Sequence, residues 1–109
     1  MIYEVKGRLV AERAREFLDK LSDGSIEAQQ PDGREIVASM WRARIGYDGI
    51  ARWTETCFCP SPLAHERETV LEHFFSDLEM VEADQHRTYS GAPLMEHLAF
   101  LNVDTRTVA

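Results

Sequence analysis

The stretch IGYDGIARW, residues 45–53, decides how the chain folds, because it holds the clearest turn in the sequence. At its centre, Asp48-Gly49 is a favoured two-residue hairpin turn, since both residue types tolerate a positive φ. Runs rich in β-forming residues flank the turn, from Glu35 to Ile45 and from Ile50 to Phe58. The stretch therefore predicts two antiparallel strands joined at Asp48-Gly49.

A strand and a helix are expected before this hairpin. From Val10 to about Gly24, apolar residues recur at three- and four-residue steps, which is the spacing of an amphipathic helix. Residues 25–33 end in the breaker Pro31-Asp32-Gly33 and predict a loop. Residues 2–9 alternate as a half-buried strand does, with Tyr3, Val5 and Leu9 facing one way and Glu4, Lys6 and Arg8 the other.

A second helix and a fourth strand are expected after the hairpin. Pro60 and Pro62 end the strand because proline lacks a ladder donor, and Ser61 can cap a helix that starts at Pro62. A strand is predicted over Asp77–Ala83. The helix is expected to bury Leu63, Val70, Leu71, Phe74 and Phe75, and the chain then continues into a short helix near Leu94–Leu98 and a strand-like end over Phe100–Val108.

The order strand–helix–strand–strand–helix–strand predicts an α+β fold, a split β-α-β-β-α-β antiparallel sheet with both helices on one face. This order resembles the ferredoxin-like fold, and a chain of 109 residues with a C-terminal extension is similar to the dimeric α/β-barrel superfamily. The resemblance implies a homodimer whose sheets meet through their helix-free faces. We expect a single domain over residues 1–109, with a core of about 2–83 and an extension over 84–109.

Charge and composition narrow the range of partners and compartments. The net charge of −7 disfavours nucleic acid and anionic membrane surfaces, because both carry negative charge themselves. Charges interrupt the N-terminal MIYEVKGRLV where a signal peptide needs an unbroken apolar segment. With only two cysteines in the chain, we expect a soluble cytoplasmic protein.

The register of the hairpin sorts its side chains between the two faces of the sheet. A two-residue turn places Ile45 opposite Arg52 and Arg44 opposite Trp53. The core face is then expected to hold Trp41, Ala43, Ile45, Arg52, Thr54, Thr56 and Phe58. The opposite face is expected to hold Met40, Arg42, Arg44, Trp53, Glu55 and Cys57, together with Glu4, Lys6 and Arg8 from the first strand.

This charged face is the predicted ligand site, because unpaired charges are too costly to bury in a dry core. An arginine there would hold a carboxylate or phosphate while Trp53 supplies a flat apolar wall, and the loop carrying His86 would reach the mouth of the cavity. No catalytic residue is assigned. The predicted ligand-binding residues are Lys6, Arg8, Arg42, Arg44, Trp53, Glu55 and His86.

Two other interpretations of the face stay open. It is equally consistent with an exposed sheet surface on which Arg42 and Glu55 form a cross-strand ion pair. A protein-interaction module is the second, and would use the same face or the C-terminal arm from Phe100.

The cysteines raise a third possibility, a thiol metal or redox protein. Cys57 and Cys59 share one side of an extended strand, but a structural zinc site needs four ligands. His65 and one of His73, His86 and His97 would have to complete it, and no usual ligand spacing is present. No basic residue adjoins the thiols to activate them. We therefore expect neither a metal nor a cofactor, and expect both cysteines to pack in the core.

Overall fold

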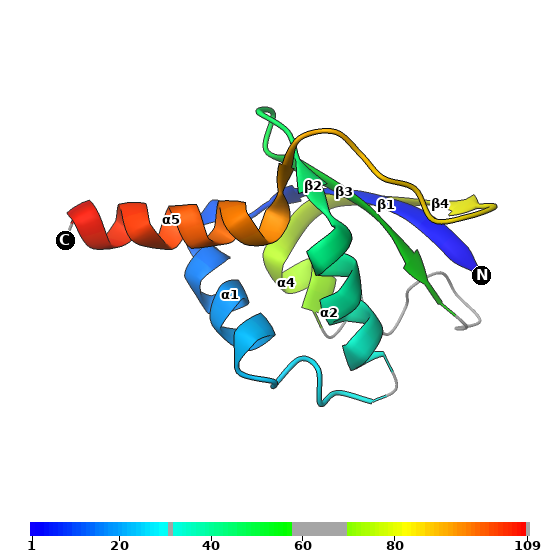
Figure 1. The fold of residues 1–109 in the computed structure, drawn as a ribbon, viewed down its shortest axis with the longest axis horizontal. Coiled ribbons are helices and arrows are strands. Elements are labelled where there is room, and N and C mark those ends of the chain that lie inside the picture. The colour runs from blue at the N-terminus through cyan, green and yellow to red at the C-terminus, as the bar shows by residue number, and fades with distance from the viewer. Residues whose placement is uncertain (31, 58–69, 109) are drawn as a thin grey trace.

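Five strands form one antiparallel sheet in the computed structural model, which describes residues 1–30, 32–57 and 70–108, the last seven of them as backbone only. The strand order is β4-β1-β3-β2-β5. Helices pack against one face of this sheet, and the other face carries no helix among the described residues (Figure 1). The arrangement is of the α+β class and is compatible with a ferredoxin-like fold, although β5 and the helix before β2 add to a plain split sheet.

Strand β1, Ile2–Leu9, lies inside the sheet between β3, Ile50–Thr56, and β4, Phe75–Ala83. Its alternation is as expected: Val5 and Leu9 are buried under the helices, and Lys6 and Arg8 are exposed. The side chains of β1 therefore divide the molecule into a helix-covered face and a helix-free face.

The predicted first helix is confirmed as a 3-10 turn, η1 at Ala11–Arg13, followed by α1 at Ala14–Ser22. Phe17 from α1 is fully buried and stacks on Phe74 with ring centroids 4.4 Å apart. Trp53 from β3 joins this aromatic core through Phe75, at a centroid distance of 5.0 Å. Packing of α1 on the sheet thus depends on rings from four separate elements.

The strand predicted over Glu35–Ile45 is wrong. Gly33–Arg42 form helix α2, and only Arg44–Ile45 form a strand, β2. The β-branched pair Ile36-Val37 favours a strand locally, but Ile36, Ser39 and Met40 are all buried on one side of α2. Burial at three- and four-residue steps outweighs β-propensity here, because it lets the whole segment cover the sheet.

The hairpin is confirmed, but its loop is one residue longer than predicted. Gly49 has a φ of 78° and its N–H donates to the Gly46 carbonyl at 3.0 Å, while the Gly46 N–H donates to Ile50 at 3.1 Å. Tyr47, Asp48 and Gly49 therefore form the loop, a common hairpin type with glycine in the left-handed position. The Ile50 N–H also donates to the Asp48 carboxylate at 3.0 Å and holds the pKa of that group below its usual range.

Because of the extra loop residue, each side chain of β3 lies on the face of the sheet opposite to the predicted one. Arg52 now stands opposite Arg44, and Ala51 opposite Ile45. Because side chains alternate along a strand, a shift of one residue sends every side chain to the other face. Trp53, Glu55 and Cys57 therefore lie under the helices, whereas Arg52, Thr54 and Thr56 lie on the helix-free face.

The second predicted helix is described only at its end. The segment 58–69, with Pro62 and Leu63, lies outside the described residues, and α4 covers Glu72–Phe74. Val70, Leu71 and Phe74 are buried as expected. The fourth strand is confirmed as β4, which begins two residues earlier than Asp77, at Phe75.

The C-terminal region is one helix where a short helix and a strand were predicted. Leu94–Val108 form α5, preceded by the unpredicted edge strand β5, Ala92–Pro93, which pairs with β2. Leu94, Met95 and Leu98 are buried, so the first turns of α5 pack on α1 and α2 while its C-terminal end extends away from them (Figure 1). The spacing of Leu94, Leu98 and Leu101 continues the helical period that a strand interpretation ignores.

Candidate functional site

Three cationic side chains cross the helix-free face in one row. Lys6 on β1 stands opposite Arg52 on β3, and Arg52 stands opposite Arg44 on β2. We call Lys6, Arg52 and Arg44 the cation row. Directly opposed like charges destabilise a sheet, so the row favours negative charge placed above it.

Counter-charges from the protein only partly balance the cation row. Lys6 pairs with Glu79 at 3.3 Å and Arg52 with Asp48 at 3.6 Å. Arg44 donates to the Gly91 carbonyl at 3.3 Å and makes no ion pair within the part of the chain that the structure describes. The positive charge is therefore least compensated at the β2 end of the row.

A segment between β4 and β5 crosses the helix-free face, and we call residues 84–91 the strap (Figure 1). The Tyr89 hydroxyl donates to the Glu4 carboxylate at 2.7 Å, and the Arg87 guanidinium lies 3.4 Å from the other oxygen of Glu4. Glu4 on β1 thus ties the strap to the middle of the sheet.

His86 provides a second attachment of the strap. Its ring nitrogens lie 2.8 Å from the Thr54 hydroxyl and 3.2 Å from the Thr56 hydroxyl. The Arg87 N–H also donates to the Thr54 hydroxyl at 3.3 Å, and Thr54 is completely buried under the strap. His86 is therefore on the helix-free face, where it attaches the strap to β3. It does not line the groove between the strap and the cation row.

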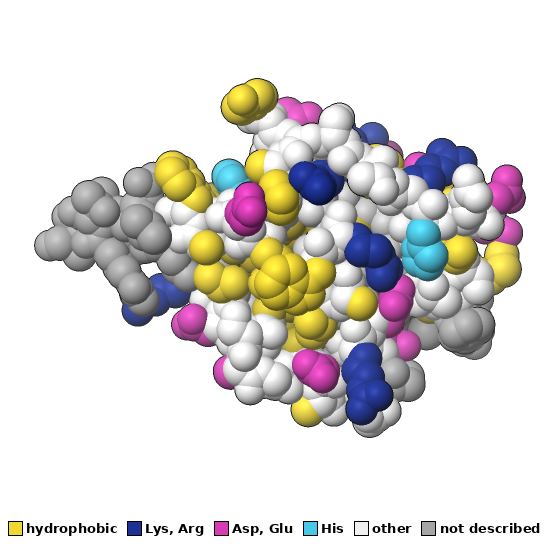
Figure 2. All heavy atoms as spheres, viewed as in Figure 1, with side chains coloured by type: hydrophobic (Ala, Val, Ile, Leu, Met, Phe, Trp, Pro, Cys, Tyr) yellow, Lys and Arg dark blue, Asp and Glu magenta, His cyan; other side chains and the backbone are white. Residues whose placement is uncertain are grey.

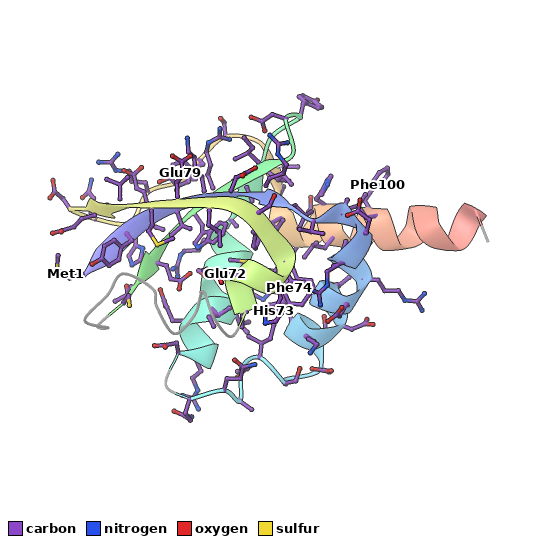
Figure 3. The ribbon with its side chains drawn as sticks, turned by 180° about the vertical axis from the view of Figure 1, so that it is seen from behind. Met1, Glu72, His73, Phe74, Glu79 and Phe100 are labelled. Atoms are coloured by element: carbon purple, nitrogen blue, oxygen red, sulfur yellow. The ribbon has the colours of Figure 1, made fainter. Side chains whose placement is uncertain are left out.

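A groove of about 300 Å³ lies between the strap and the cation row. This volume is at the lower end of the range for small-molecule sites. Glu79 rises from β4 on the side of the sheet away from the helices (Figure 3). The side chains that line this groove include Glu4, Lys6, Arg52, Glu79, Val81 and Tyr89.

Tyr89 is a hydrogen-bond donor in this groove at neutral pH. Burial and the hydrogen bond to the Glu4 carboxylate raise the pKa of Tyr89 to about 12. The phenol therefore keeps its proton, since loss of that proton would place two negative charges side by side. Its hydroxyl suits the positioning of a ligand or of Glu4 and does not suit the role of a base.

Trp53 and Glu55 do not lie on the helix-free face, and their predicted placement there is wrong. Both are completely buried under the helices. The Trp53 indole N–H donates to the Glu55 carboxylate at 2.9 Å, and the Ser39 hydroxyl donates to the same oxygen at 3.1 Å. The register shift in the hairpin places both residues in a hydrogen-bonded part of the core.

Arg42 is also outside the groove, because it belongs to α2. Its guanidinium donates to Glu35 at 3.0 Å and to the Thr54 carbonyl at 2.8 Å. Arg42 thus pairs with Glu35 on its own helix, and it links α2 to β3. Of the predicted ligand-binding residues, only Lys6 lines the groove. Arg44 lies at the end of the cation row, and Arg8 lies two residues beyond Lys6 on β1.

Sequence reasoning missed Arg52, Glu79, Glu4 and Tyr89 as site residues. Arg52 and Glu79 are both in register with Lys6, so the correct hairpin loop together with the order of the strands would have found them. Tyr89 has no sequence signal, because its place depends on a contact with Glu4, 85 residues away.

The described residues hold no group of side chains arranged as metal ligands. Cys57 is buried, as expected of a cysteine that packs in the core, while Cys59 and His65 lie outside the described residues. His73 is exposed on α4, and His97 on α5 lines a different hollow.

This second hollow, of about 490 Å³, lies between the hairpin loop and the start of α5. Its walls are mainly glycine, alanine and isoleucine. Among the described residues that line it, His97 is the only one with a basic side chain. The groove is smaller, but charged and hydrogen-bonding groups converge in it, and such groups fix the orientation of a ligand. The groove is therefore the candidate site.

No helix in the described part of the chain has both the length and the apolar character needed to cross a membrane. No protein-family model matches the chain, and no curated protein or solved structure matches it either.

Proposed function

We propose that the groove on the helix-free face binds a small molecule that carries a carboxylate or phosphate and an apolar part. The observation that supports this most directly is the cation row, in which Lys6, Arg52 and Arg44 stand in register across three adjacent strands. Arginine binds such anions with two parallel hydrogen bonds, which makes the contact directional as well as attractive.

The rest of the groove suits the remainder of such a ligand. Val81 on β4 is 63% exposed and offers apolar contact. The half-buried Tyr89 of the strap also lines the groove, with its hydroxyl held by Glu4. The proposed function is binding, because none of these groups has the geometry of an activated nucleophile or of a base next to one.

Substitution of the central arginine tests this function. Arg52→Gln removes the charge in the middle of the row, and we expect it to weaken binding of phenyl phosphate and of 3-phenylpropionate about tenfold, the effect of losing one charged hydrogen bond. Titrations followed by NMR or calorimetry measure this. Arg15→Gln is the control, since Arg15 is exposed on α1 and has the same charge. Equal affinity in the two variants, or no binding to the unaltered protein, would overturn the proposal.

The homodimer stays a prediction, and so does membership of the dimeric α/β-barrel superfamily. Two helix-free faces that met would bring two cation rows together, so we expect a bound anion to favour the pairing. The protein-interaction module remains the alternative. Exposed hydrophobic side chains on the helix-covered face favour it: Trp41 on α2 is 66% exposed, and hydrophobic side chains gather over the helices (Figure 2).

A further inference from the structure

We infer that the ligand of the groove is a zwitterion of amino-acid size, with its carboxylate at the cation row and its ammonium group beside Glu79 and Glu4. This inference rests on the proposed function and narrows it to one class of molecule. It comes from the distribution of charge across the groove, which is negative at Glu79 on β4 and at Glu4 and positive at Arg52 on β3, with Arg44 on β2 next to Arg52 beyond the groove.

The strand register separates the two signs of charge. Glu79, Lys6 and Arg52 are consecutive partners on β4, β1 and β3, so Glu79 and Arg52 lie two strand intervals apart, or about 10 Å between backbones. Glu4 lies diagonally across from Arg52, because its own partner on β3 is Thr54, at a typical spacing of about 7–8 Å. Side chains that lean inward from these positions leave room for one small dipolar molecule.

A plain anion fits this charge pattern less well than a zwitterion does. An anion above Arg52 has the Glu79 and Glu4 carboxylates as neighbours in the same groove. Glu79 repels it, and Glu4 repels it less, because Arg87 lies 3.4 Å from Glu4. An ammonium group on the same ligand changes the sign of those two interactions. The carboxylates then add affinity and also fix the direction in which the ligand lies.

The existing ion pair between Lys6 and Glu79 does not prevent this rearrangement. The two side chains are 48% and 67% exposed, and exposed pairs contribute little to stability. When the ligand binds, Lys6 turns toward its carboxylate beside Arg52, and Glu79 turns toward its ammonium group. The apolar part of the ligand lies against Val81 and the Tyr89 ring, which line the same groove.

Three related molecules test the inference. L-phenylalanine carries both charges, 3-phenylpropionate lacks the ammonium group, and 2-phenylethylamine lacks the carboxylate. We expect phenylalanine to bind about two- to fivefold more tightly than 3-phenylpropionate, which is the range for a partly exposed charged contact, and 2-phenylethylamine to bind most weakly. The dissociation constants come from NMR titration at one ionic strength.

A pair of glutamates on the same strand supplies the matched variants. Glu79→Gln should reduce the preference for phenylalanine over 3-phenylpropionate, leaving only the contribution of Glu4, and should tighten the binding of 3-phenylpropionate itself. Glu82→Gln should preserve the preference, because Glu82 stands opposite Tyr3 and so projects from the other face of β4. Both variants change the net charge by the same amount.

The possible outcomes separate the inference from the function on which it rests. If 3-phenylpropionate binds to the groove as tightly as phenylalanine does, the zwitterion is wrong while anion binding stands. If the preference is as large in Glu79→Gln as in Glu82→Gln, the assignment of the ammonium group is wrong. If none of the three molecules shifts the resonances of groove residues, both the inference and the proposed function fail.

Discussion

Glu4 uses both of its carboxylate oxygens to hold the strap against the sheet, one toward Tyr89 and the other toward Arg87. Its neighbour on β3, Thr54, holds the strap through His86. These contacts bring polar side chains from opposite ends of the chain together on one face. Single substitutions at these positions therefore affect the closure of the groove more than they affect the aromatic core.

Tyr89→Phe should flatten the alkaline pH dependence of stability. The pKa of Tyr89 is about 12 in the folded protein, against about 10 for an unperturbed tyrosine, so folding favours the protonated phenol. The resulting stabilisation is complete below pH about 10 and is lost as the pH rises toward about 12. Chemical denaturation at a series of alkaline pH values should show the free energy of unfolding falling more steeply in the unaltered protein than in Tyr89→Phe.

The fully exposed Tyr47 supplies the control for this measurement. Tyr47→Phe removes a hydroxyl from the hairpin loop and should leave the pH dependence as it is in the unaltered protein. A Tyr89→Phe variant with the same alkaline slope as Tyr47→Phe would contradict the role given to the Glu4–Tyr89 hydrogen bond.

Among the elements, β5 depends on one glycine at the end of the strap. Gly91 has a φ of 114°, and a Cβ atom there would lie 2.5 Å from the Ile45 carbonyl oxygen. Gly24 also has a positive φ, 87°, but open space surrounds the position of its Cβ atom. The two sites therefore separate backbone strain from steric collision.

Gly91→Ala should destabilise the protein more than Gly24→Ala does. Strain alone predicts a cost of about 1–2 kcal/mol for Gly24→Ala. Gly91→Ala adds the collision with β2, and so should exceed that cost and also weaken anion binding, because Arg44 donates to the Gly91 carbonyl. Urea denaturation of both variants measures the difference. Equal losses of unfolding free energy would show that β5 does not pack against β2 as described.

The elements that the sequence predicts are those whose own pattern determines them. β1 alternates, α1 repeats its apolar residues at helical spacing, and the left-handed Gly49 marks the hairpin. The segment Gly33–Arg42 was predicted wrongly because its β-branched residues favour a strand. Its burial follows a helical period, which becomes visible only in the assembled core.

Two features of the candidate site could not be predicted from local pattern. Loops of two and of three residues are both compatible with GYDG, yet the choice between them decides whether Trp53 or Arg52 faces the groove. The strap has no periodic pattern, and its course is set by contacts with Glu4 and Thr54 that are far away in the sequence.

At the scale of the whole molecule, the helix-free face and the helix-covered face are the two candidate surfaces for the predicted homodimer. We expect an anion such as phenyl phosphate to promote a dimer through the helix-free face. Val81→Asp should abolish that dimer, because it adds negative charge and removes apolar area at an exposed position of this face.

Trp41→Asp is the matched variant on the helical side, since Trp41 has a similar exposed fraction. It should leave the anion-dependent dimer intact in sedimentation velocity. Loss of association in Trp41→Asp, with Val81→Asp unaffected, would favour the protein-interaction alternative and would contradict pairing through the sheet.

The strap joins the two edge strands of the sheet, β4 and β5, and so crosses the full width of the sheet. Four strand intervals make the sheet about 19 Å wide, and the register offsets the two ends of the strap by five residues, or about 17 Å, along the strands: Ala83 is level with Ile2, and Ala92 is level with Gly7. The two ends are therefore about 25 Å apart, whereas the connection between them can reach about 30 Å when extended. The strap therefore has only about 5 Å of spare length, and a ligand in the groove must fit beneath a segment that can rise little from the sheet.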